Sequence, residues 1–293
     1  TCPLSSPNRG GMSVQSSLHT QLPLLATVGR RYSWPMAPGR YLPLTPPRLW
    51  IGDLLELSRA LPLVPFERHM NLARVAEARR HAGVGWCALF VKAMGMVSQR
   101  RPELRRALLP WPWPRLYEHG ASAAMIAVER EWHGELGVFF GQIDEPENRP
   151  LVEIEALLRE LKTAPVESVR EFRRLFRVAR LPRLMRRLAW RYAHRVCGPT
   201  RVKYFGTFGV SVTAGEGATA LSLVSPSTST LHYGIIAPDG GIDVRLTFDH
   251  RVLDGAPVAR ALMELEETLC GEVLSELHAV RCPGCAAPAN ASP

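Results

Sequence analysis

Hydrophobic and polar positions alternate along this chain with periods that predict both helices and strands. In residues 85–101 and 149–165, apolar residues recur every three or four positions, which places them on one face of a helix. Residues 121–130 and 134–143 are instead predicted as a pair of strands, and residues 240–252 as a further strand in which β-branched and aromatic residues alternate with polar ones. The pattern therefore predicts a protein with both kinds of element.

The other predicted elements are bounded by prolines and glycines. Thr45 is placed to cap a helix with Pro46 in its first turn, and Pro62 ends that helix. Further predictions are a strand and short helix at 65–83, strands at 202–215 and 230–238, and a final helix at 255–277. Because no internal repeat or clear linker divides these elements, we expect one α/β domain.

Composition separates the two ends of the chain from its middle. Residues 1–42 are rich in Ser, Pro and Gly, and we expect a disordered leader there. The folded domain is expected at 43–277, followed by a disordered tail at 278–293. Within the domain, Trp111 and Trp113 alternate with prolines, and we expect them to pack on the core.

Charge and cysteine content narrow the class of protein. A formal net charge of +9 favours anionic partners such as coenzyme A, acidic carrier proteins or anionic lipid. Six irregularly spaced cysteines do not resemble a disulfide framework, and no apolar run is long enough to span a bilayer. We therefore predict a cytoplasmic protein. His278, Cys282 and Cys285 lack the fourth ligand that a zinc site needs, so no metal site is predicted.

The segment "TFDHRVLDGAPVARAL" carries the most distinctive chemistry. Alternate residues from Val244 to Phe248 share one face of the predicted strand, and His250 continues that face where the strand ends. A histidine held there can take a proton at neutral pH. Asp254 can cap the next helix, hold an arginine or orient the loop, and Gly255 allows close backbone approach. Spacing alone favours a plainer interpretation, in which a partly buried histidine is satisfied by local hydrogen bonds and Asp254 is a simple N-cap.

The wider string "FDHRVLDGAPVARAL" closely resembles the signature of the 2-oxo acid dehydrogenase acyltransferases, the dihydrolipoamide acyltransferase family, which is related in fold to chloramphenicol acetyltransferase. "GTFGVSV" resembles the strand that supplies a serine to that family's active site, and the serine falls on Ser211. "PLTPPRLWIGDLLELSRALPLVPFERHMNLARV" resembles the opening helix and first strand, with Arg48 on the arginine near the helix start. The resemblance runs in the family order from about Pro43 to Gly271.

This resemblance implies a fold and a mechanism. The fold is α/β, an α+β two-layer sandwich of the chloramphenicol acetyltransferase-like kind, with a mixed, mostly antiparallel sheet flanked by helices. His250 would be the general base that deprotonates a thiol, and Ser211 would donate a hydrogen bond to the oxyanion. Asp254 would be mainly structural. Arg48, Gly255 and Thr213 would support the site or bind substrate. Without His250, an ordinary strand hydroxyl would be the better interpretation of Ser211.

The same resemblance implies partners. The family is built of trimers with each site between two subunits, so His250 from one subunit would meet Ser211 from its neighbour. The expected donor is acyl-coenzyme A and the expected acceptor a dihydrolipoamide-like thiol. We expect no lipoyl attachment on this chain, so a lipoyl or acyl carrier protein would act in trans. The polar tail favours an isolated trimer over a larger cage.

Two departures from the family leave other functions open. No lipoyl-type module is evident, and the segments "GELGVFFGQI" and "SVTAGEG" differ from the family pattern near the expected substrate walls. A scaffold of the same fold that lost turnover is one alternative, although such a scaffold need not keep both His250 and Ser211. An acyltransferase for a carrier-bound, hydroxyl or amine acceptor is another.

A basic helical insertion at about 166–200 is the largest departure. Arginines alternate there with apolar residues at helical spacing, and Pro182 is expected to break or kink the helix. Two interpretations stay open: an amphipathic helix pair that contacts an acidic carrier protein or anionic lipid, or a solvated face packed on its own core. No nucleic-acid-binding motif accompanies the arginines, so we expect no nucleic acid partner.

Overall fold

A computed structural model describes residues 40–211, 217, 219–221 and 223–280, and the described residues from Pro43 onward form one compact unit. The helices are α1 (Pro46–Ser58), α2 (Ala73–Ala82), α3 (Trp86–Arg100), α4 (Leu151–Thr163), α5 (Arg170–Ala179), α6 (Arg183–Arg195), α7 (Gly198–Phe205), α8 (Gly255–Thr268) and α9 (Leu274–Ala279), with shorter helical segments η1 (Pro102–Arg105), η2 (Pro146–Asn148) and η4 (Leu269–Val273). The strands are β1 (Leu63–Asn71), β2 (Arg106–Leu109), β3 (Arg115–Glu118), β4 (Ala123–Trp132), β5 (Glu135–Asp144), β6 (Phe208–Val210), β7 (Ser229–Tyr233) and β8 (Gly241–Asp249).

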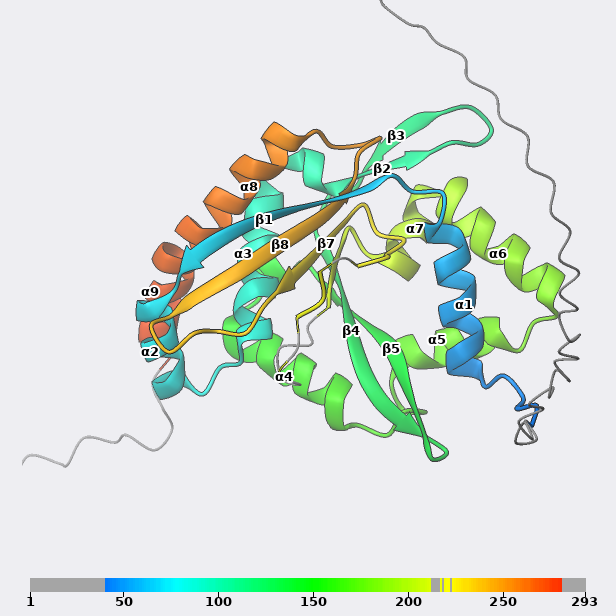
Figure 1. Cartoon of the computed structure of the whole chain (residues 1–293), viewed down its shortest axis with the longest axis horizontal. Coiled ribbons are helices and arrows are strands. Elements are labelled where there is room, and N and C mark those ends of the chain that lie inside the picture. The colour runs from blue at the N-terminus through cyan, green and yellow to red at the C-terminus, as the bar shows by residue number, and fades with distance from the viewer. Residues whose placement is uncertain (1–39, 212–216, 218, 222, 281–293) are drawn as a thin grey trace, which may run out of the picture. The chain divides into compact units, whose positions relative to one another are not determined.

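The described strands form one large mixed sheet and one small hairpin (Figure 1). In the large sheet the order is β1-β8-β7-β6-β4-β5, and β2 pairs with β3 apart from it. The pairs β1–β8, β7–β8 and β4–β5 are antiparallel, whereas β6 is parallel to both β4 and β7. The predicted mixed, mostly antiparallel sheet is therefore confirmed.

Helices cover the sheet unevenly. One face packs on α3, α4 and α8, and its inward side chains on β8 (Val244, Leu246 and Phe248) are almost fully buried. The helices α1 and α5 to α7 gather instead beside the edge strand β5, on the right of Figure 1. There Trp50 of α1 and Phe172 of α5 pack against Phe139 of β5 with ring centroids about 5 Å apart. This arrangement exists because β5 is an edge strand whose apolar side chains need a cover.

The structure confirms one of the local predictions and corrects two others. The basic stretch splits at Pro182 into α5 and α6, as expected. Val202–Phe205 was predicted as a strand but ends helix α7, because Gly198 and Pro199 begin a helix that stops at Gly206, which has a positive φ of 66°. Trp111 and Trp113 were expected in the core and are instead exposed at the turn between β2 and β3.

The C-terminal helix α9 runs to Ala279, two residues into the predicted tail. The remainder of that tail, Cys282 and Cys285 among it, lies outside the described residues, as do residues 1–39 of the predicted leader. Within the described ranges, no helix is both long and apolar enough to cross a bilayer.

Candidate active site

His250 lies in the turn that follows β8, a strand held by hydrogen bonds to a neighbour on each side. Its ring centroid is 5.7 Å from that of Phe248, so the imidazole continues the buried face of the strand, as predicted. The backbone N–H of His250 donates to the carbonyl of Pro62 (3.1 Å). Half of its side chain is exposed to solvent. The structure thus presents an accessible imidazole on a rigid support, which suits a group that must move protons.

The turn that carries His250 is organised by the buried carboxylate of Asp249. That carboxylate accepts hydrogen bonds from Nε (2.9 Å) and one terminal nitrogen (2.7 Å) of Arg251, and from the backbone N–H of Arg251. Burial of the Arg201 guanidinium lowers the pKa of Arg201 to about 10. The negative charge of nearby Asp249 opposes this shift but is the smaller effect. These contacts hold the loop that carries His250 in place.

Asp254 and Gly255 begin helix α8. Asp254 occupies the N-cap position without a side-chain capping hydrogen bond, and its Oδ1 lies 3.8 Å from Nδ1 of His250. The side chain of Asp254 therefore does not make the predicted cap and is instead an electrostatic neighbour of His250, a role that the sequence had not suggested. A Cβ atom on Gly255 would lie only 2.6 Å from the ring of Phe66, so the predicted close backbone approach at Gly255 is present.

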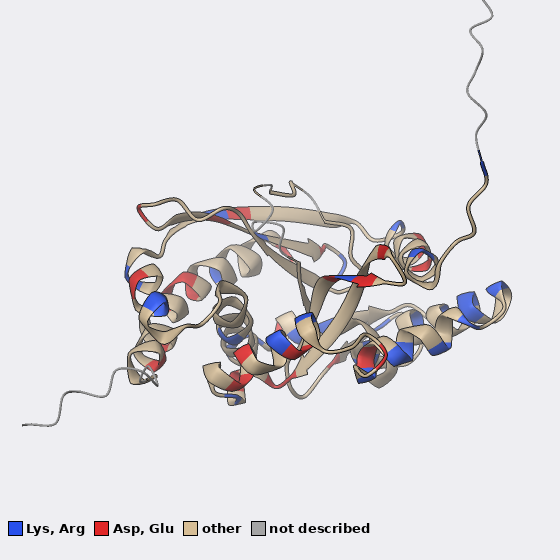
Figure 2. Ribbon diagram, turned by 90° about the horizontal axis from the view of Figure 1, so that it is seen from below, with Lys and Arg blue, Asp and Glu red and all other residues tan. Residues whose placement is uncertain are grey.

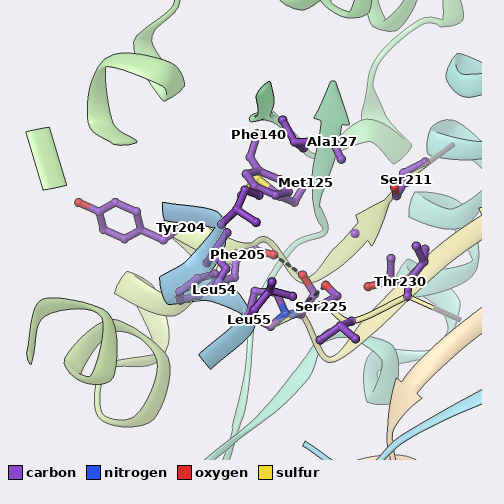
Figure 3. A pocket seen from close by; sticks show the side chains of 18 of the residues that line it. Leu54, Leu55, Met125, Ala127, Phe140, Tyr204, Phe205, Ser211, Ser225 and Thr230 are labelled. Atoms are coloured by element: carbon purple, nitrogen blue, oxygen red, sulfur yellow. Dashed lines mark hydrogen bonds between the residues drawn. The ribbon is translucent and has the colours of Figure 1, made fainter. Parts of the chain in front are cut away.

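Ser211 follows the short strand β6 and is held to β7. Its N–H donates to the carbonyl of Leu231 (3.2 Å), and its carbonyl accepts a hydrogen bond from Nδ1 of His232 (2.7 Å). The side chain of Ser211 lines a cavity of about 200 Å³, together with Ser225 and Thr230 (Figure 3). Thr213, the other predicted residue of this segment, lies outside the described residues.

The register of β7 separates His250 from Ser211 within one chain. Val210 is paired with Leu231, so Ser211 lies level with His232, whereas Phe248 is paired with Ser229, so His250 lies beyond the other end of β7. At 3.3 Å per residue, these levels are about 16 Å apart along the strand. A base must come within about 3 Å of the proton that it takes. One chain alone therefore does not bring the two residues to one reacting group.

Arg48 does not join either residue in the single chain. It lies near the start of α1, and its Nε donates to Oε1 of Glu135 (3.1 Å) at the beginning of β5. More than half of its side chain is exposed. The structure thus places Arg48 on the surface beside the β4–β5 hairpin, and its predicted supporting role stays a prediction.

Three buried residues near the site, His232, Arg201 and His194, were not predicted from the sequence. His232 is buried against Ser211, and Arg201 donates to the carbonyls of His194 (2.8 Å) and Pro226 (3.0 Å) behind the turn of Asp249. For His232, the period-two alternation of "TLHY" was a usable signal, because it places His232 on the same sheet face as Thr230. For Arg201 and His194 no sequence signal was available, since they lie in or directly after the arginine-rich segment, where most charged residues are exposed.

Comparison with known proteins agrees with this architecture. The sequence matches no family model and no curated protein. Among solved structures, similarity extends to the cubic core of a pyruvate dehydrogenase multienzyme complex, with 19% identity, a TM-score of 0.58, and coverage of 83% of this chain and 95% of that chain. The dihydrolipoamide acetyltransferase of Azotobacter vinelandii has 20% identity and a TM-score of 0.57 at the same coverages.

A truncated catalytic core of the 2-oxoacid dehydrogenase complex from Thermoplasma acidophilum is also similar, with 16% identity, a TM-score of 0.57, and coverage of 80% of this chain and 99% of that chain. At such identities the comparisons establish the fold. The chain thus has the fold of the dihydrolipoamide acyltransferase catalytic cores, as the resemblance of its His-Asp-Gly segment predicted.

Proposed function

We propose that this protein is an acyltransferase that moves an acyl group between coenzyme A and a thiol acceptor of the dihydrolipoamide kind, at sites formed between two copies of the chain. The observation that carries the proposal is the placement of His250 and Ser211. Each is held by a strand end, His250 is exposed and Ser211 lines a cavity, yet they lie at opposite ends of β7. Two such groups can act on one substrate only if the second comes from a neighbouring copy.

The reaction follows from the orientation of His250. Its Nδ1 faces Asp254, which leaves Nε2 to take the proton from the acceptor thiol. The thiolate attacks the thioester carbonyl, and the hydroxyl of Ser211 from the neighbouring copy donates a hydrogen bond to the oxyanion that forms. The tetrahedral intermediate then breaks its bond to the sulfur of coenzyme A. The released thiolate receives the proton from His250, which returns the base to its starting state.

The comparisons support these roles. The Azotobacter vinelandii enzyme has been studied at a serine, a histidine and an asparagine, the last two four positions apart. His250 and Asp254 have the same spacing, with aspartate in place of asparagine. The similarity to multienzyme cores favours an oligomer, of which a trimer is the smallest form that we propose, and a lipoyl or acyl carrier protein in trans as the source of the acceptor. The cytoplasmic location stays a prediction.

Thiol release from a panel of acyl-coenzyme A donors, with dihydrolipoamide as acceptor, tests the activity. We expect His250→Ala to lower kcat/KM by about 10²–10⁴-fold and Ser211→Ala by about 10²–10³-fold. If the wild-type protein releases no thiol with any donor and acceptor, the activity is wrong, and a scaffold of the same fold becomes the better interpretation.

Co-assembly of the two inactive variants tests the shared site. In mixed oligomers of His250→Ala and Ser211→Ala, a site has both intact groups when each neighbour supplies the one that it retains, which occurs at about a quarter of the sites. Co-expression should therefore restore about a quarter of the wild-type activity. The same variants assembled separately and then mixed are the control and should stay inactive. Co-expressed oligomers that are equally inactive would exclude a site between copies.

A further inference from the structure

We propose that the cavity beside Ser211 binds an extended apolar group, either the acyl chain of the thioester or the hydrophobic body of the acceptor. This inference rests on the proposed acyl transfer and specifies its substrate class. It starts from the lining of the cavity, which is mostly apolar and whose serine and threonine residues are Ser211, Ser225, Ser227 and Thr230. In Figure 3, Ser211 and Thr230 lie to the right of Leu54 and Phe205.

The apolar wall comes from two strands and four helices. Its main side chains are Leu54 and Leu55 of α1, Met125 and Ala127 of β4, Phe140 of β5, Leu175 of α5, Trp190 of α6, and Tyr204 and Phe205 of α7. A polar or charged substrate group would lose its hydration against such a wall without gaining hydrogen bonds. An apolar group instead binds more tightly, with an affinity that rises about fourfold for each buried methylene.

Part of this wall belongs to the segment in which the chain departs most from the family that it resembles. Trp190 is nearly fully buried, and its Nε1 donates to Oδ2 of Asp53 (3.2 Å), a carboxylate that also pairs with Arg186. Its ring meets that of Tyr204 edge to face, with centroids 5.4 Å apart. The buried side of the basic segment is thus fixed as a cavity wall. The α5–α7 segment therefore contributes part of the apolar wall, which α1, β4 and β5 complete.

Two series of substrates separate the two sources of the apolar group. In one, the acyl chain of the coenzyme A donor grows from acetyl to octanoyl with a fixed acceptor; in the other, acetyl-coenzyme A is fixed and alkyl thiols of rising length are offered. We expect kcat/KM to rise with chain length in one series, by up to about fourfold per methylene until the cavity is full. Activity that falls with length in both series would overturn the inference and leave the proposed acyl transfer intact.

Ala127→Phe tests the location, because it adds a ring inside the cavity. It should abolish the chain-length preference, so that the longest substrates react no faster than the shortest. Leu136→Phe is the matched control, since Leu136 is exposed on the adjacent strand β5 and does not line the cavity. If no donor and acceptor react, which would contradict the proposed function, binding of an unreactive octyl-coenzyme A thioether and of octanethiol still decides the inference. Binding of either that Ala127→Phe weakens at least tenfold supports it, and binding of neither, or unaffected binding, overturns it.

A second inference rests on a different surface, the outward face of α6. Leu184, Leu188 and Tyr192 follow one another at four-residue spacing, and each is more than half exposed. The buried residues Arg186, Trp190 and Ala193 lie on the opposite face of the helix. Because helix surfaces in water are normally polar, an exposed apolar stripe of this kind marks a contact surface.

The turn between β2 and β3 lies against the C-terminal end of α6 and carries further exposed aromatic residues. Trp111 and Trp113 are each more than half exposed, and the N–H of Trp111 donates to the carbonyl of Arg195 at the end of α6 (3.3 Å). The exposed arginines Arg191 and Arg195 lie beside the stripe, and basic residues recur along the helices on the right of Figure 2. We define the lipid-facing surface as Leu184, Leu188, Tyr192, Trp111 and Trp113.

We infer that this surface lies on an anionic phospholipid bilayer. Tryptophan and tyrosine favour the boundary between headgroups and acyl chains, leucines enter that boundary, and arginines bind anionic headgroups. An acidic carrier protein would satisfy the arginines but would not require two exposed tryptophans next to a leucine stripe. This surface is separate from the cavity beside Ser211, so either inference can fail without the other.

Sedimentation with vesicles of phosphatidylcholine, with and without phosphatidylserine, tests the surface. We expect binding only to the anionic vesicles, weaker at high salt, and reduced at least tenfold by Leu188→Gln combined with Trp113→Ser. Leu136→Gln, an exposed apolar position outside the surface, should bind as the wild type does. No binding at low salt, or equal binding by all variants, would overturn the inference. A smaller oligomer in the double variant would also overturn it, because the surface would then join copies of the chain.

Discussion

Nδ1 of His250 lies 3.8 Å from Oδ1 of Asp254, whereas the nearer aspartate in sequence, Asp249, turns away and binds Arg251. The two carboxylates thus have different roles in the turn. Asp249 is buried and holds the backbone in place. Asp254 is 84% exposed and stands where it would stabilise the positive charge that His250 gains in its proposed role as base.

This division predicts different effects for the two aspartates. Asp254→Asn should lower kcat/KM only about fivefold, because a charge at this distance in a wet site contributes about 1 kcal/mol, and it should leave the free energy of unfolding nearly unchanged. Asp249→Asn should lower the free energy of unfolding by about 3 kcal/mol, because Arg251 loses its ion pair and the buried Arg201 loses a nearby negative charge. Urea denaturation and steady-state kinetics check both; the reverse order of effects would contradict the assignment.

Gly255 is predicted to be needed for packing. In Gly255→Ala, the new Cβ would meet the ring of Phe66 at 2.6 Å, so the start of α8 must shift. We expect a loss of about 1–3 kcal/mol in the free energy of unfolding, accompanied by lower activity because Asp254 begins that helix. Gly271→Ala is the control, since no atom lies within 4 Å of its Cβ position. Equal unfolding free energies for the two variants would contradict the prediction, because they would show that the ring of Phe66 moves aside without loss of stability.

We predict that removing one partner of the buried ion pair between Asp53 and Arg186 lowers the free energy of unfolding more than removing both charges. Arg186→Met leaves the carboxylate of Asp53 buried without its partner and should cost about 3–5 kcal/mol in unfolding free energy. Adding Asp53→Asn removes the charge and keeps a hydrogen-bond acceptor for Trp190, so the double variant should recover part of that loss. Denaturant unfolding of the two single variants and the double variant measures the coupling. Strictly additive losses would show that the pair does not interact.

His194 makes the stability depend on pH. Burial, and next the nearby Arg201, lower its pKa well below the ordinary value, so the unfolded chain binds a proton more readily than the folded one. Its contribution is therefore complete above the unfolded pKa of about 6.5 and is lost as pH falls below it, at up to about 1.4 kcal/mol per pH unit.

The variant His194→Gln tests this dependence, because its amide can still donate to the carbonyl of Pro226, which the imidazole Nε2 contacts at 3.1 Å. We expect the unfolding free energy of the variant to fall less steeply than that of the wild type between pH 7 and pH 5. His278→Gln, at an exposed position on α9, should keep the wild-type slope. Identical slopes for the wild type and His194→Gln would contradict the prediction.

Local patterns were enough to predict much of this protein. The alternation from Val244 to Phe248 indicated a strand with one buried face and placed His250 on it, since side chains on a strand repeat every two residues. Pro182 predicted the break between α5 and α6, because proline cannot continue a helix interior. The "FDHRVLDGAPVARAL" string indicated the fold through resemblance. The strand predicted at Val202 failed because short apolar runs do not distinguish strand from helix.

The tertiary structure decided what depends on residues distant in sequence. The separation of His250 from Ser211 follows from the pairing of β6 and β8 with β7, and strand register is not written in either segment alone. The cavity beside Ser211 draws its walls from residues as far apart as Leu54 and Thr230. Trp111 is likewise exposed because the β2–β3 hairpin stands apart from the large sheet, which the sequence of the turn does not reveal. The sequence by itself thus determined the elements and the candidate chemistry, whereas packing between elements determined which groups meet, because burial and contact are properties of the assembled chain.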